Sequence, residues 1–157
     1  MSNRTVEIHK HKKKIFTGQY TAITEKSFVI FFIGIRVNNL WAVHKWLPFV
    51  VRLFALKVHL KNQYQASLLN TNTWFSWREI MLVQYWDSLE NLEAFSRSEI
   101  EPHIRIWRKY NQSIGKSAHL GVWHETYLIK KEDYECVYNN MPRVGLSAAK
   151  KHSKMGY

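Results

Sequence analysis

The histidines that fall within regular hydrophobic segments are the residues best suited to acid–base chemistry. His124 is one of them, because it lies in the strand-like sequence HLGVWHETYLI over 119–129. An imidazole gains or loses its proton near neutral pH, so in an apolar pocket His124 can act as a general base. Glu125 follows it directly, and adjacent strand residues point to opposite faces, so this carboxylate cannot orient His124 within one pocket. A core histidine bonded to a backbone carbonyl remains the alternative.

Motifs for other kinds of catalysis are missing from the sequence. It contains no H-x-x-x-H, H-E-x-x-H or C-x-x-C spacing, so we expect no zinc or iron site. The six glycines are scattered, which excludes a phosphate loop and a dinucleotide fingerprint, and no G-x-S-x-G elbow occurs. The single cysteine, Cys136, can form no internal disulfide and is typical of a small buried apolar side chain.

The elements that position these residues belong to a chain of 157 residues, which is enough for one domain. Hydrophobic residues make up 46% of it and aromatic residues 15%, so the chain is not typical of a disordered protein. The longest apolar run, 28–35, is shorter than the about 20 residues of a membrane span. The polar beginning lacks the features of a secretory signal. We therefore expect a cytoplasmic protein with no membrane span.

Positive charge is concentrated at the two ends. The formal net charge is +11, and residues 1–14 hold five Lys or Arg residues against one glutamate, while residues 143–157 hold four and no acidic residue. Such ends can make weak contact with anionic lipid or nucleic acid, but no nucleic-acid recognition motif accompanies them, so solvated ends are the simpler interpretation. We predict flexible basic segments over 1–26 and 147–157 around a domain over 27–146.

The first half of the domain predicts a strand followed by a helix. Segment 26–38 is continuously apolar and β-branched, which is typical of a strand buried on both faces. Asn39 can cap a helix, and Pro48 is expected to kink or restart it. The predicted core stripe of this helix consists of Val43, Trp46, Leu47, Val50, Phe54 and Val58.

The second half predicts a hairpin, two helical pieces and two further strands. The hairpin comprises segments 71–77 and 80–86, and Asp87 with Glu90 has the form of a capping box for the next helix. Pro102 begins a second helical piece. Strands are predicted over 119–129 and, as a short extra strand, over 134–138.

This β-α-β-β-α-β order predicts an α+β, ferredoxin-like fold with an antiparallel sheet. Helices cover only one face of such a sheet, whereas the first strand is apolar on both faces. We therefore expect a second copy to cover the other face, which would give a dimeric α/β barrel with a two-fold axis.

Three separated stretches also carry a family resemblance. They are GIRVNNLWAVHKWLPF over 34–49, LVQYWDSLENLEAFSR over 82–97, and GVWHETYLI with VYNNMPRVGL within 121–146. In this order they resemble the monooxygenase-like family named after a fumagillin-pathway enzyme, within the antibiotic-biosynthesis monooxygenase superfamily of dimeric α/β barrels. The resemblance extends over 27–146. The same scaffold also supports haem enzymes, isomerases and non-catalytic proteins.

The resemblance implies a cavity between the sheet and its helices, with polar groups that hold a ligand. In cofactor-free oxygenation, a base removes a proton from a phenolic or enolic substrate, whose anion gives an electron to oxygen. The groups assigned to this chemistry are the bases His124 or His103 and the positioning residues Asn38, Trp41, Trp86 and Tyr127. The groups expected to bind substrate are Arg36, His44, Gln84, Trp107 and Asn140, with Glu125 near them.

Structural roles compete with these assignments. Arg36 follows an apolar strand and is typical of an ion-pair partner for a carboxylate such as Glu125. The seven tryptophans are typical of core and dimer interface, and Asn140 is typical of a turn.

The leading hypothesis is a homodimeric monooxygenase that acts on a small hydrophobic or aromatic molecule without a nucleotide cofactor. The first alternative is a haem-binding protein in which His124, His103 or His44 is the axial ligand. The second is a carrier or interaction protein that binds a small ligand without catalysis.

Overall fold

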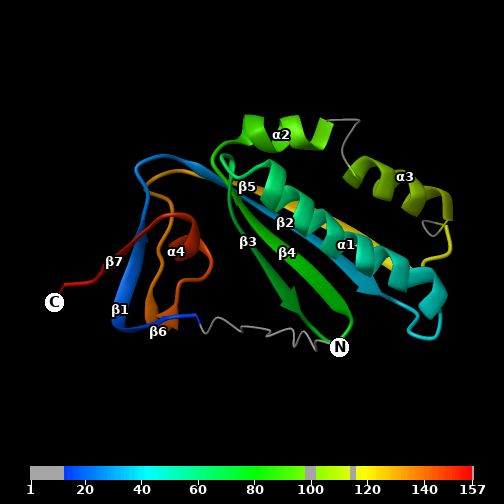
Figure 1. Ribbon diagram of the computed structural model, residues 1–157, viewed down its shortest axis with the longest axis horizontal. Helices are drawn as coiled ribbons and strands as arrows, with labels where there is room; N and C mark the ends of the chain where they lie inside the picture. Colours follow the sequence, from blue (N-terminus) through cyan, green and yellow to red (C-terminus); the bar gives the residue numbers. More distant parts are fainter. Residues whose placement is uncertain (1–12, 98–101, 114–115, 157) are drawn as a thin grey trace, which may run out of the picture.

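A computed structural model describes residues 13–97, 102–113 and 116–156, with the side chains of 102–104, 106–107 and 113 excepted (Figure 1). The elements in chain order are β1 (Ile15–Ile23), β2 (Phe28–Val37), α1 (Val43–Gln63), β3 (Leu68–Phe75), β4 (Glu79–Trp86), α2 (Leu89–Arg97), α3 (Pro102–Ser113), β5 (Leu120–Ile129), β6 (Tyr138–Pro142), α4 (Leu146–Ala149) and β7 (Lys151–Lys154). The strands form two separate sheets.

The larger sheet has the order β3-β4-β2-β5, and every neighbouring pair is antiparallel. Helices α1, α2 and α3 lie over one of its faces (Figure 1). Two strands joined by a helix, with an antiparallel strand between them, are the split βαβ unit of the ferredoxin-like fold. The predicted α+β, ferredoxin-like class is therefore confirmed, and the predicted strands 26–38, 80–86 and 119–129 correspond to β2, β4 and β5.

Strand β2 lies at the centre of this sheet because both of its faces are apolar. Val29, Ile35 and Val37 are buried under the helices and contribute to two clusters of the core. Phe32 and Gly34 alternate with them and therefore point to the opposite face. That face is hereafter called the open face, because α1, α2 and α3 lie on the other side of the sheet (Figure 1). Helix α4 packs against its end at Phe28.

The predicted core stripe of α1 is wrong in its main part. The buried residues of α1 are Phe49, Leu53, Leu56 and Leu60. The predicted Val43, Leu47, Phe54 and Val58 are exposed instead. Hydrophobic residues at helical spacing occur on two opposite sides of α1, so periodicity alone selected the wrong side.

The helix starts also differ from the predicted caps. Helix α1 begins at Val43, and its cap residue Ala42 has no capping side chain, whereas the Asn39 side chain accepts a hydrogen bond from the Trp41 backbone. Pro48 lies inside α1, which continues through it.

Ser88 is the N-cap of α2, one residue later than the predicted Asp87. Its hydroxyl accepts a hydrogen bond from the Asn91 N–H at 3.2 Å, as an N-cap does. The predicted first residue of the capping box, Asp87, instead accepts a hydrogen bond from the Asn91 side chain at 2.8 Å.

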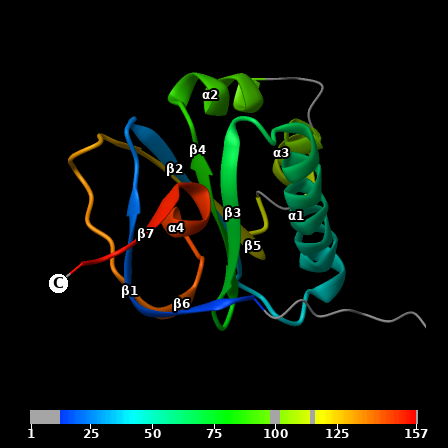
Figure 2. The same cartoon turned by 60° about the vertical axis from the view of Figure 1, so that its left-hand side comes forward.

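The smaller sheet corrects the prediction of flexible ends. It has the order β6-β1-β7, so residues 15–23 and 151–154 are strands (Figure 2). Residues 1–12 lie outside the described residues. Helix α4 contacts β1, β7 and β3, and its Leu146 is buried with Ala22 and Phe28. Positive charge led to the wrong prediction, because lysine side chains in β7 reach solvent while the backbone pairs with β1.

The last predicted strand, 134–138, is also displaced. Strand β6 begins at Tyr138 and runs through Asn140 to Pro142, where a turn was expected. Cys136 precedes it and is half-buried, and its sulfur accepts a hydrogen bond from the Ala22 N–H at 3.3 Å. Within the described ranges, no helix combines the length and apolar character needed to cross a membrane.

Leu146→Ala tests whether the end of the chain belongs to the folded core. We expect the free energy of unfolding to fall by about 2–5 kcal/mol, because the substitution leaves a cavity beside Phe28. Lys151→Ala, at an exposed position of β7, should change it by no more than about 0.5 kcal/mol. Urea unfolding monitored by circular dichroism measures both values. Equal, small effects would mean that residues 146–154 contribute little to the fold.

Candidate ligand-binding cavity

A cavity of about 500 Å³ lies between the larger sheet and the three helices that cover it. Its floor is formed by alternate residues of neighbouring strands, including Phe31, Ile33 and Val122, and α1 contributes Phe49 and Leu53 to its wall. Such a volume, mostly apolar with a few polar groups, is typical of a site for a small organic molecule.

Gln84 is the most deeply buried polar group of this cavity. It is 1% exposed, and its side-chain oxygen accepts a hydrogen bond of 2.9 Å from the indole N–H of Trp86, which is fully buried. An indole nitrogen can only donate, so this bond fixes which end of the amide is the oxygen. The Gln84 NH₂ has no acceptor among the described residues and remains free to donate to a ligand.

Thr71 adds a second polar group beside Gln84. The two residues are paired across β3 and β4, so their side chains share the helix-covered face. The Thr71 hydroxyl oxygen is buried and has no hydrogen-bond partner among the described residues. A buried hydroxyl without a partner is costly to stability, and Thr71 is not itself among the residues that line the cavity.

His124 lines the same cavity from β5. Its ring centroid lies 5.9 Å from that of Phe31, and the residue is exposed, so it marks the solvent-facing part of the cavity. Phe31 pairs with both Gln84 and Thr126, which places His124 and Gln84 two strands apart. Two strand spacings, combined with the offset of two residues between Thr126 and His124, separate the backbone positions of Gln84 and His124 by about 12 Å, a distance that a small aromatic molecule can span.

The helices contribute polar groups that sequence reasoning missed. Glu93 and Ser96 of α2 and Tyr110 of α3 line the cavity. The Glu93 carboxylate accepts a hydrogen bond of 2.9 Å from Arg97, and the Tyr110 hydroxyl donates to the Leu120 carbonyl at 2.9 Å. Tyr110 lies in the helical piece that was predicted to begin at Pro102, but no binding role was assigned to it.

Two of the predicted site residues lie on the open face, on the other side of the sheet from the cavity. Arg36 forms an ion pair of 2.6 Å with Glu79, not with Glu125. Tyr127 donates a hydrogen bond of 2.8 Å to Glu125, and this bond raises the pKa of the tyrosine hydroxyl. Strand alternation explains where Arg36 and Tyr127 lie. It also directs the His124 side chain into the cavity and the Glu125 side chain to the open face, and the opposite facing of these two residues was predicted.

Five other predicted residues also lie outside the cavity lining. Trp86 is one of them, because it is buried in the core and reaches the cavity only through its hydrogen bond to Gln84. Trp41 is 94% exposed, and His44 is exposed in the first turn of α1. The Asn38 side chain donates to the Ala118 carbonyl at 3.0 Å, at the end of the sheet. Asn140 belongs to the smaller sheet, where its side-chain oxygen accepts a hydrogen bond from Gly18 at 2.8 Å. The side chains of His103 and Trp107 lie outside the described residues.

The described lining contains one charged residue and one imidazole. His124 could provide an axial ligand, but Glu93 is the charged residue of the described lining, and no Lys or Arg there can pair with the two carboxylates of haem. Within the described ranges, no three His, Cys, Asp or Glu side chains are grouped as metal ligands.

Comparison with known proteins places this geometry in a family. The family described as Monooxygenase af470-like matches residues 28–146. The chain belongs to that family. A curated relative, Monooxygenase af470 from Aspergillus fumigatus, is 26% identical over 123 residues, which are 73% of this chain and 43% of the relative. The family covers β2 to the start of α4, and thus the strands and helices that enclose the cavity.

A solved structure supports the fold. The crystal structure of an aldoxime dehydratase in complex with butyraldoxime matches with a TM-score of 0.70 and 15% identity, over 88% of this chain and 44% of that chain. At this identity the likeness concerns the ferredoxin-like fold alone. This chain spans less than half the length of either relative.

Val122→Trp tests whether the cavity takes up apolar molecules. The larger side chain fills part of the cavity floor, so we expect the affinity for the neutral fluorophore N-phenyl-1-naphthylamine to fall by about tenfold or more. Val137→Trp, at an exposed position outside the cavity, is the matched control and should leave the affinity unchanged. Fluorescence titration measures both. Undiminished binding by Val122→Trp would place the fluorophore elsewhere.

Proposed function

We propose that this chain is a monooxygenase-like oxidoreductase that acts on a small hydrophobic or aromatic molecule within the cavity. The observation that carries the proposal is the apolar cavity with His124 at its exposed part and the oriented amide of Gln84 at its buried part. Membership of a family described as monooxygenase-like supports the type of reaction.

His124 is proposed as the general base for a substrate with an acidic C–H next to a phenol or ketone. The neutral imidazole takes the proton, and the substrate anion transfers one electron to molecular oxygen. The substrate radical and superoxide then combine to form a C–O bond, and the imidazolium returns its proton to the resulting peroxide. Loss of water from the hydroperoxide leaves a new carbonyl group, so that one oxygen atom enters the product and the other leaves as water.

Gln84 is proposed to stabilise the substrate anion. Its NH₂ group donates a hydrogen bond to the phenolate or enolate oxygen, and Trp86 prevents the amide from rotating into the opposite orientation. The apolar floor excludes water, which strengthens this hydrogen bond.

Oxygen uptake with a panel of phenols and enolisable aromatic ketones tests the proposed activity. We expect at least one compound to support uptake, and His124→Ala to lower the rate by about 100-fold or more, because the base is lost. Tyr127→Phe removes a hydroxyl on the open face and should retain the rate. An oxygen electrode with mass analysis of the product makes the measurement.

Two outcomes would contradict this activity. Saturable binding of these compounds without oxygen uptake would indicate a carrier. A haemin titration that saturates at one haem per chain, with a spectrum altered in His124→Ala, would indicate a haem protein instead.

We also propose that the open face is covered by a second copy of the chain. Phe32, Met81 and Trp123 of three neighbouring strands lie on this face and are incompletely buried. The Trp123 indole lies so close to Gly34 that a β-carbon there would be 2.5 Å from it, so the ring lies flat against the sheet. The ring centroids of Phe32 and Tyr127 are 5.7 Å apart in an edge-to-face arrangement. An aromatic surface of this kind is typical of an interface between copies.

Phe32→Glu tests this assembly. We expect the unaltered protein to have the mass of a dimer, and Phe32→Glu to have the mass of a monomer, because a carboxylate would be buried at the interface. Val51→Glu, at an exposed position of α1 on the other side of the protein, should remain dimeric. Light scattering during gel filtration gives the masses, and circular dichroism verifies folding. An unaltered protein that is monomeric at micromolar concentration would contradict the proposed dimer.

A further inference from the structure

Helix α1 has a second apolar side that faces solvent. Its buried residues, such as Phe49 and Leu53, face the sheet. On the opposite side, a stripe at intervals of three or four residues leaves its side chains 36–61% exposed. This stripe, hereafter the outer stripe, consists of Val43, Leu47, Val51, Phe54 and Val58.

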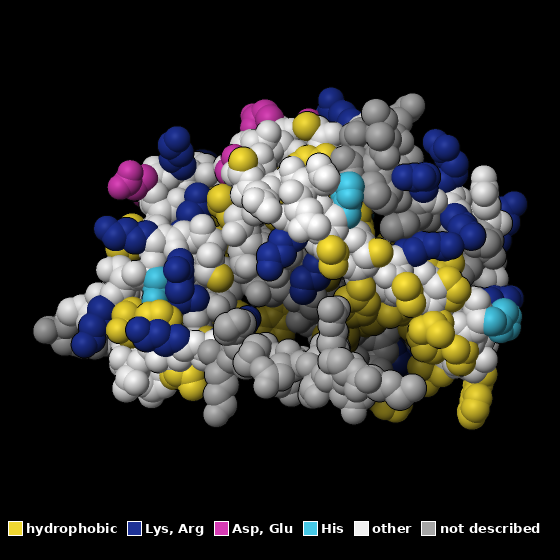
Figure 3. All heavy atoms as spheres, in the orientation of Figure 1, with side chains coloured by type: hydrophobic (Ala, Val, Ile, Leu, Met, Phe, Trp, Pro, Cys, Tyr) yellow, Lys and Arg dark blue, Asp and Glu magenta, His cyan; other side chains and the backbone are white. Residues whose placement is uncertain are grey.

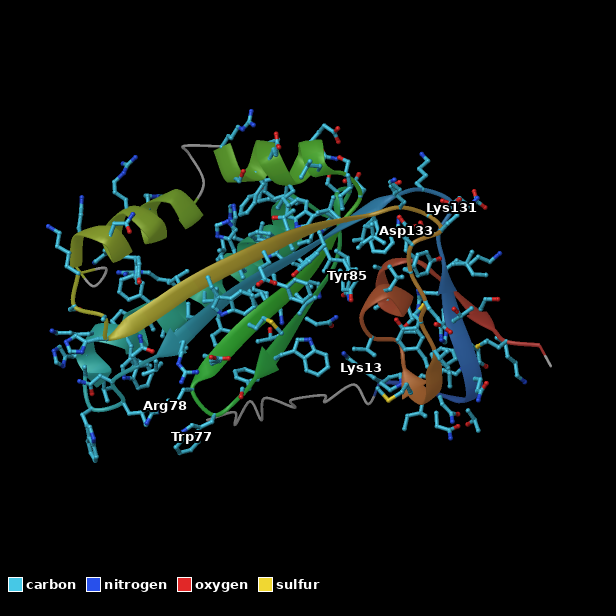
Figure 4. All side chains as sticks on the ribbon, turned by 180° about the vertical axis from the view of Figure 1, so that it is seen from behind. Lys13, Trp77, Arg78, Tyr85, Lys131 and Asp133 are labelled. Carbon is cyan, nitrogen blue, oxygen red and sulfur yellow. The ribbon has the colours of Figure 1, made fainter. Side chains whose placement is uncertain are left out.

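Exposed aromatic residues extend the outer stripe at the start of α1. Trp41 precedes the helix and is 94% exposed, while Phe75 and Trp77 of the β3–β4 hairpin are 67% and 84% exposed. The Phe54 and Phe75 rings stack with centroids 6.1 Å apart, which joins the hairpin to the outer stripe. Hydrophobic side chains gather over the start of α1 in Figure 3, and Figure 4 shows Trp77 at the tip of the hairpin.

Basic residues outnumber acidic ones around this surface, where Glu79 of the hairpin is paired with Arg36. Helix α1 contains Lys45, Arg52, Lys57 and Lys61 and no acidic residue. Of these, Lys61 is exposed, whereas Lys57 donates a hydrogen bond to Thr73 and Arg52 packs over the buried Phe49 ring. Arg78 lies beside Trp77 and donates a hydrogen bond of 3.4 Å to the Asn38 carbonyl, next to the loop that carries Trp41. The whole chain has a formal net charge of +11. A surface of this charge is complementary to an anionic partner.

We propose that the outer stripe, with Trp41, Phe75 and Trp77, docks the protein onto an anionic lipid bilayer. The combination of an aliphatic stripe, basic residues such as Lys61 and Arg78 near it, and Trp side chains at one end is typical of helices that lie in the membrane interface. Lys61 and Arg78 contact anionic headgroups while the aliphatic side chains enter the boundary of the acyl region. Charge favours an anionic bilayer over a second copy of the chain as the partner of the outer stripe, because two positively charged copies of this surface would repel each other.

The position of α1 gives this docking a consequence for ligand uptake. One side of the helix lines the cavity through Phe49, Leu53 and Leu56, and the other side would rest on the bilayer. Apolar molecules concentrate in a bilayer, so docking would place the cavity beside their source. The docking itself does not depend on the proposed oxidation.

Vesicle sedimentation of the full chain tests the docking. The probe is a vesicle of phosphatidylcholine and phosphatidylserine at about a three-to-one ratio. We expect the unaltered protein to sediment with it, to bind pure phosphatidylcholine more weakly, and to release as salt is raised. Val51→Glu should lower the partition coefficient by about tenfold or more, because a carboxylate replaces an inserted aliphatic group.

Ile15→Glu is the matched control. Ile15 is 63% exposed on β1, against 60% for Val51, and the substitution changes the charge equally. It should leave vesicle binding within about twofold of the unaltered protein. The inference is overturned if the unaltered protein does not sediment with the mixed vesicles. It is also overturned if both variants lose binding equally, because net charge or the basic ends of the chain would then account for the binding. It is also overturned if Val51→Glu abolishes self-association while vesicle binding persists.

Discussion

The antiparallel pairing of β2 along both of its edges is the constraint on which the rest of the structure depends. Its register with β4 and β5 fixes which residues of all three strands face the helices. Gln84 and His124 enter the cavity through this register, and Glu125 is kept out of it. A slip of one residue would exchange the two faces, so cavity and open face are specified by the same hydrogen bonds.

Helix α1, like the sheet, has apolar residues on two opposite sides. Leu53 and Leu56 close the cavity, while Val51 and Val58 on the opposite side remain exposed. A surface helix that served packing alone would have polar residues on that outer side. The chain thus has three apolar surfaces: the inner side of α1, the outer side of α1 and the open face of the sheet. The inner side of α1 is the one that is buried within the monomer.

These repeated apolar surfaces explain how much of the structure could be predicted from the sequence. The strands of the larger sheet could be predicted because β2 is continuously apolar and alternation fixes the facing of His124 and Glu125. The buried side of α1 could not, because periodicity identifies an apolar side without telling what covers it. Strand β7 was missed because its lysines hide an ordinary backbone pairing with β1. Arg36 and Tyr127 were assigned to the cavity because the resemblance indicated residue types near a site, whereas facing depends on register.

The polar groups that do line the cavity restrict what it can bind. Trp86 can only donate, so it occupies the oxygen of Gln84 and leaves a donor at the buried part of the cavity. A hydrocarbon would leave the Gln84 NH₂ group unsatisfied, whereas a carbonyl, phenolate or enolate oxygen would accept a hydrogen bond from it. With its oxygen held there, an aromatic ligand extends past Phe31 toward His124. The buried amide thus determines the orientation in which the ligand's acidic proton meets the only imidazole among the described residues of the lining.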